Sequence, residues 1–425
     1  MVPHLITALS GPINELEQRI LESLPAIERW FRLEWMEHTP AFYTSVDVRN
    51  AGFKLAPVDT SLFPGCFQLL TDDMLPLAVQ AAMAAIEKIC PEAKNLLLIP
   101  ERSADTDALM NVAQLTRIFH QAGMNVRLGS IDETIAGPTP VELPDGTTLT
   151  LEPLVRTRGR LGLKHFDPCT ILLNTQLAGG VPKVLEGIHE QYLLPPLHAG
   201  WTMRRRNQHV HAYEEVAKKF AKLLGMDPWL INPMHASCGE VDFADDAAAD
   251  CLMTNSEALL AKVRRKYKEY GIQEKPFVIV KADGPAGSAV HTVRDVKEIG
   301  ELCRQWRDGS TASQFREVLL QEGVPTYERV NDAAAEPVVY MIDRYVVGGF
   351  YRIHPERGPD ESLNAPGCSY VPLALAESGQ FPKLGAKQGA APPNRFYMYG
   401  VIARLAMVAA AYELEANDPD AEVYE

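Results

Sequence analysis

Cysteine is scarce in this chain, and its placement suggests no covalent framework. The seven cysteines among 425 residues are odd in number, widely scattered and free of any Cys-x-x-Cys pair. This pattern argues against both a disulfide scaffold and a cysteine-based zinc site, so we expect reduced thiols.

The chain also lacks a long apolar run and a surplus of basic residues. No run reaches the length that spans a bilayer, and charged or polar residues such as Glu15, Glu17 and Arg19 interrupt the first 21 residues, which favours an amphipathic helix over a signal peptide. The 41 Lys and Arg against 55 Asp and Glu give a net charge of -14, which opposes binding to nucleic acid or anionic lipid. The sequence therefore predicts a cytoplasmic protein without nucleic-acid or membrane partners.

What is present is an ordinary globular composition, with 46% hydrophobic and 23% charged residues, in a chain long enough for two or three domains. An apolar run at 96–99, helical periodicity at 109–121 and a second run at 126–129 predict a βαβ unit and a parallel sheet. Alternation around a Pro-Asp-Gly turn predicts a hairpin at 141–154, and the change of composition near residue 200 predicts a domain boundary.

Other elements follow from the same periodicities. The predicted helices cover 212–224, 256–270 and the apolar 395–413, and the predicted strands cover 43–48, 171–174, 229–231, 277–280, 318–321 and 338–347.

One segment suits phosphate binding. The apolar strand 277–280 runs into Lys281, and the loop after it contains Gly284 and Gly287. Small residues let backbone amides approach phosphates, and a lysine at a strand end adds a positive charge. The alternative is a surface lysine beside an ordinary turn.

A second segment repeats this design. The apolar strand 318–321 ends at Gln321 and Glu322, and Val324 follows. An adenine and a ribose require backbone N–H and C=O groups beside a carboxylate, which such a strand end can offer. The alternative is a bare strand terminus.

A third segment, 338–354, predicts a strand, a turn at Gly348 and Gly349, and a returning strand. Asp343, Arg344 and Arg352 interrupt these apolar strands, and charged residues are seldom buried without a partner. Either they pair with one another, or the arginines stabilise a transferring phosphoryl group while Asp343 helps to hold magnesium.

The loop beyond the third segment contains further oxygen donors. Glu361 and Asn364 supply a carboxylate and an amide oxygen, which magnesium prefers, although such residues are also common in plain loops.

Taken in order, the lysine-ended strand, the glycine loop, the glutamate-ended strand and the Asp-Arg-x-Val-Val-Gly-Gly segment resemble the ATP-grasp ligases, in particular their glutathione synthetase branch. The segment 207–231 is similar to the region that carries the first nucleotide-binding lysine of that fold, which implies Lys219. The resemblance implies an α/β protein with a pre-ATP-grasp-like βαβ domain at 1–200 and an ATP-grasp-like α+β catalytic region at 201–425, with a lid near 230–320.

A closer resemblance covers almost the whole chain. The strings 46–60, 95–101, 190–201 and 341–354 are similar to the proteobacterial type of glutamate-cysteine ligase. This implies ATP-dependent ligation of the γ-carboxylate of glutamate to cysteine through an acyl phosphate, with Mg²⁺, as the first step of glutathione biosynthesis. The expected partners are these small molecules, and a homo-oligomer is left open.

The resemblance also implies residues for the amino-acid substrates. A glutamate needs a cation and hydrogen-bond donors, which Arg49, Asn50 and Lys54 supply in a string that also contains Asp47. The alternative is a structural loop with a network of charges. Arg204, in the run 204–206, either faces a substrate or belongs to a solvated turn.

Two other functions stay open: one because a sequence does not display the pocket shapes that set substrate identity, the other because of one departure from the family. The loop 284–290 is shorter than in the family and lacks a Tyr-Gly-Met-Gly type of sequence, and Pro285 has no N–H for a phosphate. The alternatives are an ATP-grasp ligase for another pair of substrates and a catalytically impaired homologue that only binds a nucleotide or an amino acid.

Overall fold

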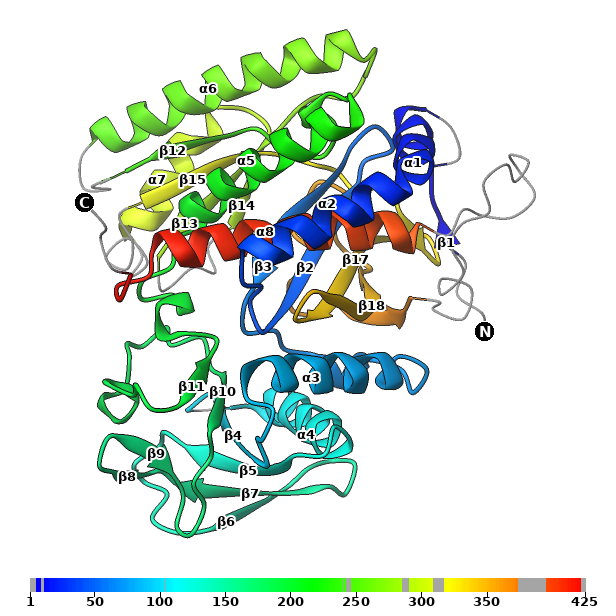
Figure 1. Ribbon diagram of the computed structural model, residues 1–425. Coiled ribbons are helices and arrows are strands. Elements are labelled where there is room, and N and C mark those ends of the chain that lie inside the picture. The colour runs from blue at the N-terminus through cyan, green and yellow to red at the C-terminus, as the bar shows by residue number, and fades with distance from the viewer. Residues whose placement is uncertain are drawn as a thin grey trace.

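The computed structural model describes residues 5–8, 11–102, 104–239, 241, 246–284, 290–308, 317–373 and 395–421. The fold is mixed α/β with several sheets, as Figure 1 shows. Within these residues no helix is long and apolar enough to cross a membrane. All seven cysteines are free, as the scattered thiols predict.

The largest sheet joins the two ends of the chain. Its seven strands are β1 (Leu5–Ile6), β2 (Tyr43–Asn50), β3 (Leu55–Ser61), β16 (Arg329–Val330), β17 (Ala333–Ile342), β18 (Tyr345–His354) and β19 (Ser369–Pro372). Its central pairing is antiparallel, with β2 of the N-terminal region hydrogen-bonded to β17. The strands of the first 61 residues therefore share a sheet with the C-terminal region, which a boundary near residue 200 does not anticipate.

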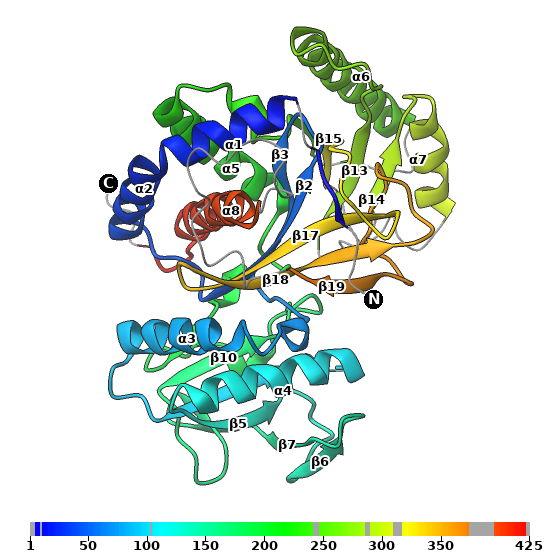
Figure 2. The ribbon, with the colours of Figure 1, turned by 90° about the vertical axis from the view of Figure 1, so that its right-hand side faces the viewer.

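Helices cover both faces of this sheet (Figure 2). One face carries α1 (Pro12–Glu22), α2 (Leu24–Glu37), α5 (Arg206–Leu224) and α8 (Phe396–Ala416). The expected alanine-rich terminal helix is α8, which is buried along nearly its whole length between the sheet and α5. The other face packs against α3 (Leu75–Ile89).

The six-stranded sheet forms a separate lobe below α3 in Figures 1 and 2. Its order is β11 (Tyr192–Leu194), β10 (Thr170–Asn174), β4 (Asn95–Pro100), β5 (Asn125–Ser130), β7 (Thr148–Pro153) and β6 (Thr139–Glu142), with a small hairpin of β8 (Val155–Thr157) and β9 (Arg160–Gly162) beside it. The predicted βαβ unit is confirmed, because β4 and β5 are parallel and α4 (Thr106–Gln121) connects them. The predicted hairpin is confirmed as β6 and β7.

A four-stranded antiparallel sheet lies at the other end of the molecule. Its order is β12 (His235–Cys238), β15 (Glu317–Glu322), β13 (Val278–Asp283) and β14 (Val290–Val293). Two helices, α6 (Asp246–Glu269) and α7 (Glu298–Asp308), cover it (Figure 1). The strand that holds Lys281 is longer than predicted, so this lysine lies within β13 and not at its end.

Two predictions of local structure are wrong. The turn of the third segment falls at Asp343 and Arg344, while Gly348 and Gly349 lie inside β18. Glycine is required there by space, because a Cβ on Gly348 would lie 2.7 Å from the Sδ of Met74 on the loop before α3.

The predicted strand at 229–231 is a short 3-10 helix, Pro228–Leu230. Pro228 suits the first turn of a helix, and the carboxylate of Asp227 accepts a hydrogen bond from the backbone N–H of Trp229. This local capping outweighs the apolar character of the segment.

Candidate active site

A pocket opens between the large sheet, α5 and the four-stranded sheet. We call it the Lys281 pocket. Its walls consist of Pro57, Val58, Asp59, Thr60, Trp201, Arg204, Arg206, His209, Val210, Tyr213, Asn232, Pro233, Lys281, Leu319 and Gln321. Both sheets therefore contribute to one site, although their strands are far apart in the sequence.

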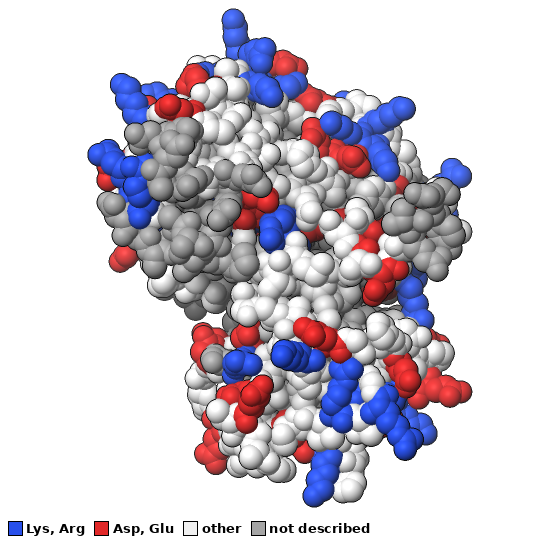
Figure 3. All heavy atoms as spheres, turned by 90° about the vertical axis from the view of Figure 1, so that its left-hand side faces the viewer, with Lys and Arg blue, Asp and Glu red and all other residues white. Residues whose placement is uncertain are grey.

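The pocket is locally positive although the chain as a whole is acidic. Lys281, Arg204 and Arg206 line it, and among the described lining residues Asp59 is the one carboxylate. On the face drawn in Figure 3, basic and acidic side chains are interspersed, and the coloured residues form no large patch of one sign. An anionic ligand would therefore meet a concentration of positive charge inside the pocket and not on that face of the molecule.

Burial and neighbouring charges shift the ionisation of the pocket groups. Burial lowers the pKa of Lys281 to about 8, although Asp59 acts in the opposite direction. The ammonium donates to the carbonyl oxygen of Val58 at 2.5 Å. Burial acts to raise the pKa of Asp59, but Arg206, Lys281 and Arg204 outweigh it and lower that pKa overall. Asp59 is therefore a carboxylate at neutral pH.

The start of α5 is fixed to the strand that holds Lys281. The carboxylate of Asp283 accepts hydrogen bonds from the backbone N–H groups of Arg206 at 2.6 Å and Asn207 at 2.8 Å. An acidic cap on a helix N-terminus satisfies N–H groups that the helix leaves unpaired. This cap places Arg206 and Lys281 on adjoining walls of the pocket.

Arg204 is held rigidly in the same wall. Its guanidinium donates to the Glu413 carboxylate at 2.7 and 3.2 Å and to the carbonyl oxygen of Thr60 at 2.9 Å. His209 also contacts Glu413, at 2.9 Å. Burial acts to raise the pKa of Glu413, but Arg204 and His209 lower it to about 2. Arg205, in contrast, donates to carbonyl oxygens of its own turn. A substrate contact by Arg204 stays a prediction.

A buried network of charges adjoins the pocket. Arg352 donates to Asp47 at 2.5 Å and to Glu336 at 2.9 Å, and Arg49 donates to Glu336 at 2.8 Å. Asp47 lies directly opposite Asp59 in the pairing of β2 with β3. The network and the Lys281 pocket are therefore neighbours across one strand pair.

Ionisation in this network is uneven. Burial raises the pKa of Asp47 to about 6, and Glu336 and Asp59 add to the rise while Arg352 opposes it. The pKa of Glu336 is lowered, because Arg49 and Arg352 outweigh its burial. Within the part of the chain that the structure describes, the Nε of Arg352 is buried without a hydrogen-bond partner.

Several predicted substrate residues are instead engaged by the protein. Arg49 donates to Glu336 and also to the carbonyl oxygens of Val324, Pro359 and Glu361. The side-chain amide of Asn50 donates to Glu328, and its oxygen accepts from the Gly52 N–H. These contacts match the structural alternative, a network of charges within the fold.

Lys54 and Glu322 form a buried ion pair with each other. Their atoms lie 2.7 Å apart, and both side chains are fully inaccessible. The Glu322 carboxylate also accepts from the indole N–H of Trp229 and from the Met234 backbone N–H, and the Lys54 ammonium lies 4.2 Å from the centre of the Trp229 ring. Neither residue lines the Lys281 pocket.

Other predicted residues lie away from the pocket. Lys219 donates to the Tyr412 hydroxyl on an exposed side of α5, and exposed Arg344 lies against Tyr345. Arg344 is eight residues from Arg352 along β18, which is about 26 Å at the usual rise of a strand. Gly284 directly follows β13, and Gly287 lies outside the described residues.

The three predicted metal ligands are not brought together. Asp343 donates its backbone N–H to Phe42 and faces Lys88 at 3.6 Å. The backbone oxygen of Glu361 accepts from Arg49. Arg49 is seven residues from Phe42, the residue that Asp343 contacts, and seven residues span about 23 Å along a strand such as β2. Asn364 is exposed in the loop after β18. The carboxylate that does line the pocket is Asp59.

The sequence reasoning missed several pocket residues. Asp59 stood in a segment that carries the resemblance and Arg206 in the arginine run 204–206, but nothing in the local pattern singled out either residue. Asn232 had no sequence signal, and its side-chain oxygen is buried in the pocket wall without a hydrogen-bond partner among the described residues. An unpartnered buried oxygen is costly, so it suits a ligand that brings a donor.

Comparison with known proteins agrees with the resemblance read from the sequence. The family model described as GshA, glutamate-cysteine ligase, matches residues 17–414. The chain is also similar to the 1.90 Å crystal structure of a "Putative gamma-glutamylcysteine synthetase" from Methylobacillus flagellatus KT. That match has a TM-score of 0.90 and 50% sequence identity, and covers 98% of this chain and 100% of the other. No curated protein matches.

Proposed function

The chain belongs to the glutamate-cysteine ligase family, and we propose that its ATP-dependent step takes place in the Lys281 pocket. The protein is a ligase that joins glutamate to cysteine. A carboxylate is a poor electrophile, so ATP has to activate the γ-carboxylate of glutamate as an acyl phosphate before the cysteine amine attacks. Phosphoryl transfer of this kind depends mainly on positioning and on neutralisation of charge.

The positive lining of the pocket is the observation that supports this placement. Lys281, Arg204 and Arg206 come from two walls, and a nucleotide triphosphate needs several cations around it. Arg204 is already fixed by Glu413, so its charge requires little reorganisation when a phosphate arrives. Asn232 offers an unpartnered oxygen to a donor such as an amino group of adenine.

We assign Asp59 as a ligand of Mg²⁺. It is the carboxylate in the pocket lining, and its pKa is lowered, so it offers hard oxygen donors at neutral pH. When bound, Mg²⁺ would neutralise charge on the phosphates. The predicted set of Asp343, Glu361 and Asn364 is less suitable, because Asp343 lies at the turn between β17 and β18, away from the loop that contains Glu361 and Asn364.

We place the glutamate beside the network of Asp47 and Arg352. Asp47 pairs across the strands with Asp59, so a substrate there would have its γ-carboxylate next to the phosphate site. Asp47 can accept from the substrate ammonium, while the unpartnered Nε of Arg352 can donate to a carboxylate.

We further propose that the four-stranded sheet and the large sheet correspond to the two halves of an ATP-grasp fold. The pocket lies between them, with β13 and β15 on one side and β3 on the other. A nucleotide held between two sheets is the arrangement that the name of this fold denotes.

The test is release of ADP by the purified protein with ATP and Mg²⁺. We expect release to require both glutamate and cysteine. Lys281→Met removes one of three pocket cations and should lower kcat/KM for ATP by at least tenfold. Lys275→Met is the matched control, because Lys275 is exposed just before β13 and should leave the rate unchanged. Equal rates for both variants would refute the placement.

A further inference from the structure

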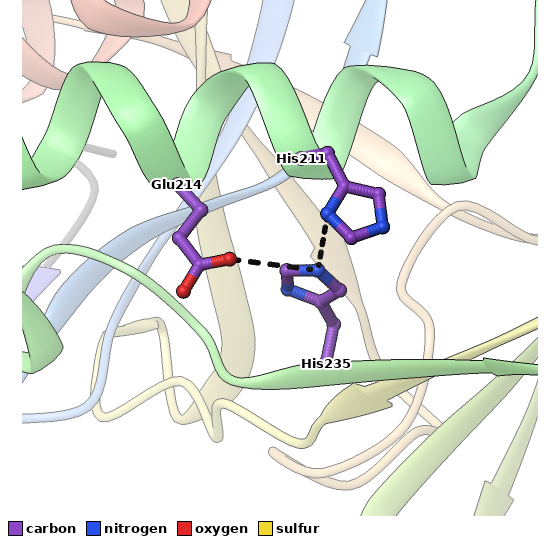
Figure 4. Close-up of side chains that lie close together, drawn as sticks. All are labelled: His211, Glu214 and His235. Carbon is purple, nitrogen blue, oxygen red and sulfur yellow. Dashed lines mark hydrogen bonds and ion pairs between the residues drawn. The ribbon is translucent and has the colours of Figure 1, made fainter.

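Outside the Lys281 pocket, two histidines and a glutamate converge between α5 and β12. His211 and Glu214 are three residues apart on α5, so their side chains leave the same side of the helix. His235 begins β12, which passes that side of the helix. Figure 4 shows the side chains of His211 and Glu214 directed toward His235. None of the three lines the Lys281 pocket.

Their spacing is that of ligands around one ion. The His211 Nδ1 lies 3.4 Å from the His235 Nε2, and the Glu214 Oε2 lies 3.8 Å from the same nitrogen. All three ligand atoms lie within 4.8 Å of one another. A tetrahedral zinc with bonds of about 2.0–2.1 Å has ligand-to-ligand distances of about 3.3–3.4 Å. A direct hydrogen bond would normally be shorter than the observed distance between the imidazoles.

We propose that His211, Glu214 and His235 bind one divalent transition-metal ion of the zinc class. Imidazole nitrogen with one carboxylate is a donor set for such ions, whereas magnesium prefers oxygen donors alone. Three protein ligands leave a fourth position for water. This site is separate from the magnesium expected with ATP.

The state of the ligands agrees with this assignment. One oxygen of Glu214 is held by Lys218 at 2.8 Å, while the other faces His235. The competing explanation is a pair of packed imidazoles beside an ordinary ion pair within the helix.

The location indicates a positioning role. His209, Val210 and Tyr213 of α5 line the Lys281 pocket, as do Asn232 and Pro233 just before β12. An ion bound by His211, Glu214 and His235 would join the helix and the strand behind two walls of that pocket. The proposal concerns metal binding alone and does not depend on where ATP binds.

The experiment is a titration of the full-length protein with Zn²⁺, after removal of metal with a chelator and in the absence of ATP. We expect one ion per chain, and Co²⁺ in its place should give the intense visible absorption of a tetrahedral site. His211→Ala should weaken binding at least tenfold. His211 is exposed, so this variant should fold normally, as circular dichroism will verify.

Matched variants separate this site from others. His189→Ala changes an exposed histidine and should have no effect. Cys251→Ser tests a rival site, because the Sγ of Cys251 lies 3.1 Å from that of Cys238, and it should also have no effect. Lys218→Met removes the cation that pairs with Glu214 and should tighten metal binding several-fold. Absence of stoichiometric binding, or binding that survives His211→Ala, would overturn the proposal.

Discussion

Replacement of Lys54 by methionine tests whether this lysine serves the fold or the substrate. The substitution leaves the Glu322 carboxylate fully buried without its cation, retaining only the Trp229 and Met234 N–H donors. Breaking a buried ion pair by removal of one partner costs about 3–5 kcal/mol of the free energy of unfolding. We therefore expect Lys54→Met to lower the midpoint of urea unfolding strongly.

The double variant gives the decisive comparison. In Lys54→Met with Glu322→Gln, no buried charge remains unpaired, while the glutamine oxygen can still accept from Trp229. The double variant should therefore be more stable than Lys54→Met alone, which independent effects would not produce. Trp229 fluorescence can report unfolding, because this indole contacts both residues.

Kinetics complete this test. The KM for glutamate of folded Lys54→Met should match that of the wild type, because the Lys54 side chain is fully enclosed against Glu322 and Trp229. The reasoning is refuted if the double variant is less stable than Lys54→Met, or if the single change costs less than about 1 kcal/mol while KM rises steeply.

Three further predictions concern pH, acid stability and packing. The pKa of Lys281 is lowered to about 8, so its positive charge is lost as the pH rises through that value; kcat/KM for ATP should fall there, and Lys281→Arg should move the fall to higher pH. The pKa of Glu413 is lowered from 4.5 to about 2, so its stabilisation is present above pH 4.5 and is lost as the pH falls toward 2. Glu413→Gln should remove about 3 kcal/mol at pH 7 and flatten the acid limb of stability in urea unfolding. Gly348→Ala would place a Cβ 2.7 Å from the Met74 Sδ and should lower Tm. Gly239→Ala should not, because its Cβ would meet no atom of the described residues within 4 Å.

Local patterns predicted much of the fold. The βαβ unit of β4, α4 and β5, the hairpin of β6 and β7 and the buried α8 all follow from periodicity and turn residues close together in the sequence. The turn between β17 and β18 was misplaced because a Gly-Gly pair usually marks a turn. Gly348 lies inside β18, where close packing against Met74 leaves no space for a Cβ.

Local patterns did not predict contacts between segments that are distant in the sequence. β2 pairs with β17, and Lys54 meets Glu322 across 268 residues. A charged residue in an apolar strand looks the same in the sequence whether it binds a ligand or a buried partner. Lys281 and Arg204 line the pocket, whereas Arg49 and Lys54 pair with Glu336 and Glu322, and the tertiary structure is needed to place each residue.

The most direct measurement is a crystal structure with Mg²⁺ and a non-hydrolysable ATP analogue. We expect the phosphates to lie among Lys281, Arg204 and Arg206, with the metal beside Asp59. Phosphates bound instead at the turn of Asp343 and Arg344, with the Lys281 pocket left empty, would contradict it.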